Sequence, residues 1–230
     1  ASARSRSTSS PLSFWSFSRR SCDFSTSLAV FACRKVAPPD AGAGSPLGDA
    51  TAAALRASGH EVLEVWRADC DLRDHAAVQE LAERLGAVDG LIHLVGGWRG
   101  GGGLAGQSDD DWDWLQTMIV GTLRNTTRAF LPSVAASSGG VMAIVSQHGV
   151  ANPTAGSANY LAAKAAAETW LLAVGNGLKG TPGRVHIERV MALYSDVDQA
   201  NEPDKDFSRH THVRDLGRTL AGLFGSASVE

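Results

Sequence analysis

From residue 41 onward, short apolar runs of strand length alternate with longer segments whose apolar residues recur at helical spacing. The strand candidates are residues 61–66, 90–95, 141–145 and 185–191. The middle two are almost wholly apolar, as expected for strands that are covered on both faces. This alternation is typical of repeated βα units around a parallel sheet. The pattern therefore predicts an α/β protein with a parallel sheet flanked by helices.

Helix-start and helix-stop signals fall in the gaps between these strands. Asp74 can cap the helix that follows it, because its carboxylate can accept the free N–H groups of the first turn. The acids at 109–111 place negative charge at the start of a helix that we expect to run to Leu131, where Pro132 would end it. An Ala-rich helix is predicted over residues 158–177.

The composition favours a single soluble domain that acts on a small molecule. A chain of 230 residues with 43% hydrophobic residues can bury one core, so we expect residues 41–230 to form one domain. The net charge is −3 and the pI is about 6.2, which excludes the basic field that nucleic-acid or anionic-membrane binding requires. No run approaches the roughly 18 consecutive apolar residues of a transmembrane helix.

The three cysteines, Cys22, Cys33 and Cys70, cannot all pair within one chain and do not have metal-ligand spacing. We therefore expect no metal site and reduced thiols, which favour the cytoplasm.

Residues 1–40 differ from the rest of the chain, with eleven serines, six lysines and arginines, and only two acids. An Arg- and Ser-rich, acid-poor start is typical of an organelle transit peptide, and a disordered leader is the alternative. We treat residues 1–40 as a separate segment and expect most of residues 1–25 to pack little against the domain.

A glycine-rich turn, Ala-Gly-Ala-Gly-Ser-Pro-Leu-Gly at residues 41–48, precedes the first predicted helix. Glycines let the backbone approach a pyrophosphate, whose charge is met by free N–H groups and the positive end of the helix. An ordinary surface loop is the alternative. The turn predicts nucleotide contacts from Gly42, Gly44, Leu47 and Gly48.

A buried parallel strand should end immediately before such a turn, yet residues 36–40 read Val-Ala-Pro-Pro-Asp. Proline has no backbone N–H to donate to a neighbouring strand. Two alternatives remain open: the first strand lies further back, in residues 27–33, or this region is irregular.

The sequence Tyr160-Leu-Ala-Ala-Lys164 carries the strongest chemical signal. Residues four apart share one face of a helix, so the phenol and the ammonium should lie close together. A nearby ammonium favours the phenolate and lowers its pKa, as a general acid/base tyrosine needs. The alternative is a buried aromatic residue next to a solvated lysine.

Several segments resemble the short-chain dehydrogenase/reductase family over about residues 41–224. The turn at 42–48 is similar to its TGxxxGxG motif, and Tyr160 and Lys164 fall at the distance expected for its catalytic pair. The resemblance implies a Rossmann-type, doubly wound parallel sheet and hydride transfer with a nicotinamide dinucleotide. It also implies a homodimer or homotetramer, which we expect to form through the helix at 158–177 and the one before it.

The same resemblance implies cofactor contacts in two further segments. Cys-Asp-Leu at 70–72 is similar to the family's adenine-contacting Asp-Val or Asp-Leu step. A glycine also follows a strand where the family has Asn-Asn-Ala-Gly. The contacts expected from these two segments are Asp71, Leu72, Val95, Gly96 and Gly97.

Within the family, the dihydropteridine reductase-like members give the closest resemblance. It is carried by His-Leu-Val-Gly-Gly-Trp-Arg-Gly-Gly at 93–101, Gly-Thr-Pro-Gly at 180–183 and Glu-Pro-Asp-Lys-Asp-Phe-Ser at 202–208. Those enzymes reduce quinonoid dihydropterin with a reduced nicotinamide cofactor. They keep the Tyr/Lys pair but lack the family's usual catalytic serine and asparagine.

This chain shares both absences. Gln147 lies thirteen residues before Tyr160, where the family has its serine, with Ser146 one residue earlier, and Ile119 occupies the asparagine position. A serine normally polarises a carbonyl or alcohol oxygen, whereas a quinonoid pterin is already electron-poor. We take Ser146 as a catalytic candidate and Gln147 as a substrate contact. Trp98 is a further substrate candidate, because its ring can stack on a flat bicyclic molecule.

The residue that follows the strand predicted at 61–66 indicates which nicotinamide cofactor binds. An acidic residue there would hold the ribose hydroxyls of NAD, whereas a basic residue accommodates the extra phosphate of NADP. The chain has Arg67, whose guanidinium can bind that phosphate with two parallel hydrogen bonds. We therefore predict NADPH, with NADH as the alternative that the dihydropteridine reductases suggest.

Three functions remain in competition. The first is a reductase acting on a pterin-like or quinonoid substrate, and the second is a carbonyl or alcohol oxidoreductase of the same fold. Ser146 beside Tyr160 would favour the carbonyl substrate, and Gln147 in that place would favour the pterin-like one. The third is a non-catalytic dinucleotide-binding scaffold, because a fold alone does not secure an activity.

Overall fold

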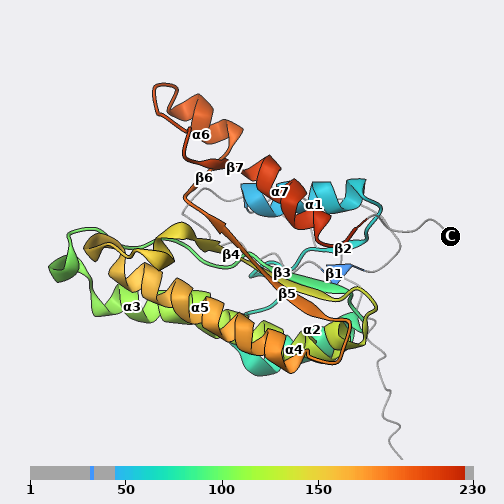
Figure 1. Cartoon of the computed structure of the whole chain (residues 1–230). Helices are drawn as coiled ribbons and strands as arrows, with labels where there is room; N and C mark the ends of the chain where they lie inside the picture. The colour runs from blue at the N-terminus through green and yellow to red at the C-terminus, as the bar shows by residue number, and fades with distance from the viewer. Residues whose placement is uncertain (1–31, 34–44, 226–230) are drawn as a thin grey trace, which may run out of the picture.

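A computed structural model describes residues 32–33 and 45–225 of the chain. Its strands are β1 (Ala32–Cys33), β2 (Val62–Leu63), β3 (Gly90–His93), β4 (Val141–Gln147) and β5 (Arg184–Val190). The last three form a parallel sheet in the order β3-β4-β5, with β4 in the middle (Figure 1). The side chains of β3 and most of β4 are buried, which confirms the prediction of strands covered on both faces.

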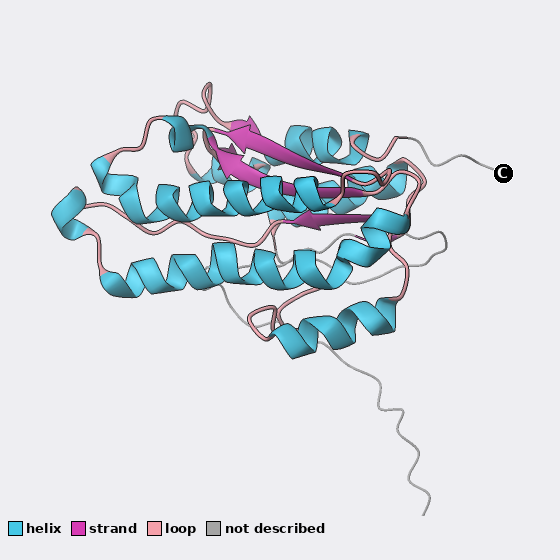
Figure 2. Cartoon of the chain, turned by 60° about the horizontal axis from the view of Figure 1, so that its bottom comes forward, coloured by secondary structure: helices cyan, strands magenta, loops and turns pink. Residues whose placement is uncertain are grey.

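Helices cover both faces of this sheet (Figures 1 and 2). The helices on one face are α1 (Pro46–Ala57) and α7 (Val213–Gly222), and those on the other are α2 (His75–Leu85), α3 (Asp109–Leu115), α4 (Thr122–Ala136) and α5 (Ala158–Gly177). Each face has its own apolar cluster, centred on residues such as Leu55 and Leu220 on the first and Leu115 and Phe130 on the second. The predicted α/β class with helices on both faces is confirmed.

The strand predicted at 61–66 is shorter than expected and pairs differently. It is confined to β2, which pairs antiparallel with β1 instead of joining the parallel sheet. Side chains occupy the backbone groups that a neighbouring strand would use. Arg56 donates to the carbonyl oxygen of Val62 at 3.4 Å, and Asp69 accepts from the backbone N–H of Trp66 at 2.8 Å. The prediction of a parallel strand in this segment is therefore wrong.

The alternatives for the strand before the glycine-rich turn can be compared only in part. β1 falls within residues 27–33, the first of the two alternatives. The remaining residues before Ser45, including Gly42, Gly44 and the segment 1–25, lie outside the described part of the chain.

The helix predicted from the acids at 109–111 is longer than expected and changes its winding along the way. α3 leads without a break into a π-helical segment, Gln116–Gly121, and then into α4. Pro132 lies inside α4 and does not end it, so the predicted stop is wrong. π-helical turns in α-helices are frequent near functional sites.

Tertiary contacts explain why α4 continues past its proline. The Ser133 hydroxyl donates to the carbonyl oxygen of Val88 at 3.0 Å and accepts from the Val88 N–H at 2.6 Å. The Val134 side chain, one residue later, is fully buried. Burial of this kind contributes about 1.5 to 3 kcal/mol per large apolar side chain, which is comparable to the cost of about 3 kcal/mol for an internal proline.

Helix α1 begins at a polar cap. The Ser45 hydroxyl accepts from the backbone N–H of Gly48, and Pro46 occupies the first turn, where its missing N–H costs nothing. α1 then crosses α7 at close range. A Cβ atom at Gly217 of α7 would lie 2.8 Å from the carbonyl carbon of Ala50, so this crossing requires a glycine.

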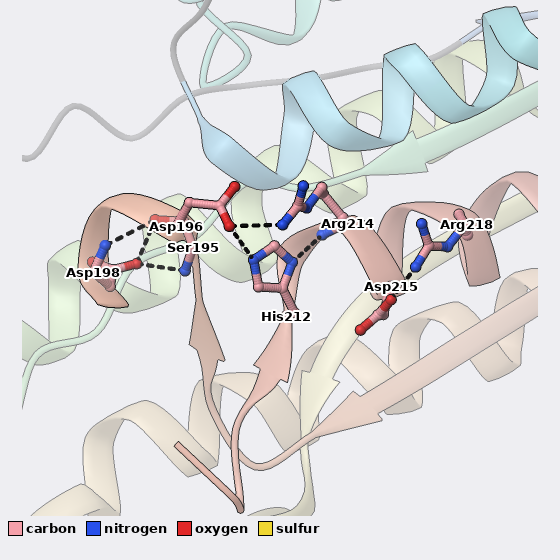
Figure 3. A network of polar contacts seen from close by, with 7 residues as sticks. All are labelled: Ser195, Asp196, Asp198, His212, Arg214, Asp215 and Arg218. Carbon is pink, nitrogen blue, oxygen red and sulfur yellow. Dashed lines mark hydrogen bonds and ion pairs between the residues drawn. The ribbon is translucent and has the colours of Figure 1, made fainter. Parts of the chain in front are cut away.

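The segment after β5 folds into short elements that border the sheet. They are β6 (Leu193–Tyr194), α6 (Asp196–Asn201) and β7 (Thr211–His212). Figure 3 shows the polar network that joins them to α7. Asp196 accepts from Arg214 at 2.7 Å and lies 3.3 Å from His212, while Ser195 and Asp198 form a capping box at the start of α6. The network fixes the segment that follows β5.

The motif at 202–208 packs against this network. Phe207 stacks on Tyr194, with ring centres 4.7 Å apart, and His212 approaches Tyr194 edge-on at 4.8 Å. The residues that supported the resemblance here therefore hold β6 in place. In the described part of the chain, we find no helix with both the length and the apolar character needed to span a membrane.

Candidate active site

A cavity of about 470 Å³ opens at the carboxyl ends of β3, β4 and β5. In parallel α/β sheets, ligands bind at this edge, because helices begin there and backbone N–H groups point outward. The structure brings nine predicted site residues into its lining: Leu47, Val95, Gly96, Gly97, Trp98, Ser146, Gln147, Tyr160 and Lys164. These residues come from four separate regions of the chain, so the fold assembles the predicted site.

A second, smaller cavity lies next to the first. The predicted residues in its lining are Arg67, Asp71, Leu72 and Val95. Val95 lines both cavities, so the two predicted groups of cofactor contacts meet at the end of β3. Cys70 also lines this cavity, and burial raises the pKa of its thiol, which keeps it protonated.

Tyr160 and Lys164 lie one turn apart on α5. Lys164 Nζ donates a hydrogen bond to the carbonyl oxygen of Val145 at 2.8 Å and lies 5.8 Å from the centre of the Tyr160 ring. Burial raises the pKa of Tyr160 to about 12. This is opposite in direction to the predicted lowering of the phenol pKa by Lys164, because removal from water disfavours the charged phenolate.

Ser146 lies in the cavity wall, but its hydroxyl is buried and makes no full hydrogen bond with any described residue. It lies beside the carboxylate of Glu168, which Arg189 binds with two hydrogen bonds of 2.9 and 2.5 Å. Burial would raise the pKa of Glu168, but Arg189, the Ser146 hydroxyl and the charge of Lys164 together lower it. Glu168 is therefore ionised at neutral pH.

The amide of Gln147 is held by the backbone on both sides. Its Nε2 donates to the carbonyl oxygen of Met191 at 3.0 Å, and its Oε1 accepts from the backbone N–H of Gly149. The side chain thus links the end of β4 to the segment after β5. It lines the cavity with its polar groups already engaged.

The glycine-rich loop after β3 is anchored on α3. A Cβ atom at Gly97 would lie 2.6 Å from the Trp114 ring, so only glycine allows this approach. Arg99 stacks on the Trp114 ring at 4.1 Å and binds Asp111 at 3.0 Å. Trp98, between these anchored residues, keeps 62% of its surface exposed at the cavity.

One amide joins this loop to the start of α5. Gln107 Nε2 donates to the carbonyl oxygens of Gly101, at 2.9 Å, and Gly156, at 3.2 Å. Gln107 Oε1 accepts from the backbone N–H of Asn159, the residue before Tyr160. Gln107 therefore fixes the distance between the glycine-rich loop and Tyr160.

Two arginines line the smaller cavity, and they differ in whether a carboxylate binds the guanidinium. Arg73 binds Asp71 through two nitrogens and, as the strongest cause, lowers the pKa of that carboxyl to about 2. Within the described residues, Arg67 is exposed and has no carboxylate at ion-pair distance, and Asp69 binds the backbone of Trp66 instead. Arg67 thus presents a guanidinium to the cavity.

Of the described positions, Gly48 and Ile119 line neither of the two cavities. Gly42 and Gly44 lie outside the described residues. Gly48 is buried in the first turn of α1, and its N–H is taken by Ser45. Ile119, at the family's asparagine position, is buried in the π-helical segment and would contact a Cβ atom at Gly96.

Several residues at the site were not predicted from the sequence: Ser157, Glu168, Arg189, Met191 and Leu193. Ser157 lies one turn before Tyr160, so helical spacing from Tyr160 could have suggested it. The Glu168–Arg189 pair joins α5 to β5 and carried no local signal.

Comparison with known proteins supports this assembly. The profile of the family described as short chain dehydrogenase matches residues 45–205. The search of curated proteins gives no match. A Pseudomonas syringae structure assigned as a short chain dehydrogenase is 20% identical, with a TM-score of 0.65, and the match covers 80% of this chain and 86% of that one.

Two further solved structures share the fold. An alcohol dehydrogenase from Thermococcus sibiricus, complexed with 5-hydroxy-NADP, is 18% identical with a TM-score of 0.57, and the match covers 67% of this chain and 66% of that one. An NADPH-bound short chain oxidoreductase from Pseudomonas aeruginosa PAO1, described as containing an atypical catalytic center, is 18% identical with a TM-score of 0.55 and the same coverage, 67% and 66%.

The chain spans slightly less than two thirds of the length of these last two proteins. Identities below one fifth establish a shared fold and leave the chemistry to the residues of the site. The family profile, in contrast, matches well over half of the chain and includes both cavities and Tyr160 with Lys164. The chain therefore belongs to the short chain dehydrogenase family.

Proposed function

We propose that this protein is an NAD(P)H-dependent oxidoreductase that reduces a small molecule, with Tyr160 and Lys164 managing the proton. The observation that carries this proposal is the position of both side chains in one cavity at the carboxyl ends of the parallel strands. A titratable pair in a cavity of this size is the usual arrangement of a general acid.

The residues present fit a nicotinamide dinucleotide. A Cβ atom at Gly96 would lie 3.8 Å from Lys164 Nζ, so the bare backbone at the end of β3 faces the lysine. The two cavities share Val95, so a dinucleotide lying along the carboxyl ends of the strands would border both linings. Leu47 and Gly97 would contact the nicotinamide half, and Asp71 and Leu72 the adenine half. When bound, the reduced nicotinamide supplies the hydride.

Arg67 supports NADPH as the preferred form, with NADH as the alternative. Its guanidinium lines the smaller cavity without a carboxylate partner in the described part of the chain. A phosphate can be bound there by charge-assisted hydrogen bonds. The Thermococcus and Pseudomonas aeruginosa structures hold NADP-type molecules in the same fold.

Tyr160 donates the proton that accompanies hydride transfer. A phenol with a pKa of about 12 is protonated at neutral pH, which is the form that a reduction consumes. Lys164, fixed by the Val145 carbonyl, places a positive charge beside the phenol and would hold the nicotinamide ribose. The pair therefore suits the reductive direction.

The side chains beside Tyr160 favour an electron-poor, quinonoid or pterin-like substrate. The Ser146 hydroxyl is buried, and both polar groups of Gln147 are bonded to backbone. Gln147, at the family's serine position, has no free donor to polarise a carbonyl oxygen, so a substrate that accepts hydride without that help fits this position best. The exposed ring of Trp98 offers a surface on which a flat molecule can stack.

A carbonyl or alcohol substrate is the second candidate, because Ser146 does lie in the cavity wall. Rotation of its hydroxyl away from Glu168 would turn it toward a bound oxygen. A tryptophan-fluorescence titration with NADPH and NADH, followed by turnover with quinonoid dihydropterin and with a panel of ketones, separates these functions. Cofactor binding without turnover of any substrate would instead indicate a dinucleotide-binding scaffold.

We further propose a homodimer or homotetramer assembled through α5 and the helix before it. Small residues such as Ala162 and Ala166 lie exposed on α5, and Leu172 on the same helix is 59% exposed. Small side chains allow two helices to approach closely. Light scattering during gel filtration tests this, and a monomer at micromolar concentration would contradict it.

A further inference from the structure

A buried ion pair lies behind the lysine of the candidate active site. Glu168 follows Lys164 by one helical turn on α5, and only 6% of its surface is exposed. Arg189 of β5 binds both of its oxygens, at 2.9 and 2.5 Å, while keeping 46% of its own side chain exposed. The charge of the carboxylate is thus held inside the protein by a partner that reaches it from the surface.

The pair is tied to the cavity wall through β4. Arg189 pairs in register with Ser146, whose buried hydroxyl lies beside the Glu168 carboxylate. Val145, the residue before Ser146 on β4, accepts the hydrogen bond from Lys164. Lys164 is therefore fixed to the strand by this carbonyl, and the carboxylate of Glu168 follows it by one turn on the same helix.

A buried carboxylate is retained only with a compensating role or partner, because removal from water is costly. Apolar residues would fill this space between α5 and the sheet at lower cost. The charge of Glu168 has a use here, since the nearby ammonium is also buried. Glu168 and Lys164 are one helical turn apart, so their opposite charges attract each other. The low dielectric constant of the protein interior strengthens this attraction.

We propose that Glu168, held by Arg189, is a positioning residue that keeps Lys164 as an ammonium aimed at the cofactor cavity. This inference rests on the proposed function, because it assigns Glu168 a role in the site where the dinucleotide binds. The substrate and cofactor are contacted by Tyr160 and Lys164, and Glu168 acts only through Lys164.

The groups around Lys164 are consistent with this role. Burial lowers the pKa of Lys164 to about 8, and the charge of Glu168 opposes that shift. His93 of β3 is buried and, with a pKa lowered to about 3 by burial, is neutral, and Tyr160 is protonated. Glu168 is thus the negative charge that acts on Lys164, and Arg189 keeps it ionised.

The test is the titration of Lys164 itself, followed by NMR of protein labelled with ¹³C at the lysine side chains. The chain contains four lysines, Lys35, Lys164, Lys179 and Lys205, and the last two are exposed and serve as internal references. Glu168→Gln removes the charge while keeping the shape of the side chain. We expect the Lys164 midpoint to fall by about one pH unit, with the reference lysines unchanged.

Two more variants complete the design. Glu188→Gln removes a carboxylate from the residue next to Arg189 on β5, and we expect no change at Lys164. In Glu168→Gln with Arg189→Gln, both charges of the pair are removed, so no unpaired buried charge threatens folding. The Lys164 midpoint should fall in this double variant as it does in the single one.

The outcomes separate this inference from the proposed function. A Lys164 midpoint that is equal in the wild type and in both Glu168 variants overturns the role of Glu168, whatever the activity. If the wild type fails to bind NADPH or NADH, the proposed function fails while the titration still reports on the ion pair. A lowered midpoint, accompanied by weaker NADPH binding at high pH in Glu168→Gln than in Glu188→Gln, supports both.

Discussion

Lys164 Nζ donates a 2.8 Å hydrogen bond to the carbonyl oxygen of Val145, which joins the second turn of α5 to the carboxyl-terminal part of β4. This bond fixes the ammonium at the carboxyl edge of the sheet, where strands and helices of this fold bind their ligands. The position of one side chain therefore depends on the strand order that brings β4 under α5.

The protonation of Lys164 makes cofactor binding dependent on pH. Its pKa is lowered to about 8, so the ammonium is present below pH 8 and is lost as the pH rises through that value. NADPH affinity, measured by fluorescence titration, should therefore decline above pH 8 in the wild type. Lys164→Met should bind NADPH weakly at every pH. If this variant still showed the wild-type decline in affinity above pH 8, the assignment would be contradicted.

Arg67 should discriminate between the two nicotinamide cofactors. We expect Arg67→Ala to weaken NADPH by one to two orders of magnitude, about 1.5 to 3 kcal/mol for a hydrogen bond to a charged group, and to leave NADH nearly unchanged. Arg56→Ala is the matched control, because the Arg56 guanidinium is bound to Glu64 and lines neither cavity, so neither affinity should change. Equal losses for NADPH and NADH in Arg67→Ala would refute the prediction.

Gln107 should control the glycine-rich loop and the substrate that lies against it. Gln107→Ala removes the donors to Gly101 and Gly156, so the loop should exchange its backbone hydrogens faster in a mass-spectrometric experiment. KM for the substrate should rise while NADPH affinity stays unchanged. Gln79→Ala, an exposed change on α2, should alter neither quantity. Unaltered hydrogen exchange of the loop in Gln107→Ala would show that Gln107 does not hold the loop in place.

The crossing of α1 and α7 should not tolerate a side chain at Gly217. A Cβ atom there would lie 2.8 to 2.9 Å from backbone atoms of Ala50 and Thr51, which cannot rotate away. Gly217→Ala should lower the free energy of unfolding by about 1 to 3 kcal/mol, measured by urea denaturation. Gly222→Ala on the same helix meets open space and should be neutral or slightly stabilising. Equal stabilities of the two variants would contradict the crossing geometry.

Elements with strong local signals were predictable from the sequence. The helix at 158–177 has the predicted bounds, because alanine-rich stretches favour helix without help from tertiary contacts. The strands near 90, 141 and 185 were recognised from their apolar runs, and Asp74 caps α2 as expected. Parallel strand order then brought residues such as Ser146 and Tyr160 to one cavity.

Features that depend on distant residues were not predictable. Pro132 stays within α4 because Ser133 bonds to Val88, 45 residues earlier. The Glu168–Arg189 pair spans two elements, and no periodicity signals it. The pKa of Tyr160 depends on how deeply the ring is buried, which four-residue spacing does not reveal.

The central claim is that Tyr160 supplies the proton in a nicotinamide-dependent reduction. The most direct test is the turnover rate of Tyr160→Phe, followed by the absorbance of the reduced nicotinamide, with cofactor affinity measured on the same sample. The variant keeps the ring and its packing but loses the titratable oxygen, so NADPH should still bind while turnover falls by about two to four orders of magnitude. Turnover at the wild-type rate with the cofactor bound would contradict the account.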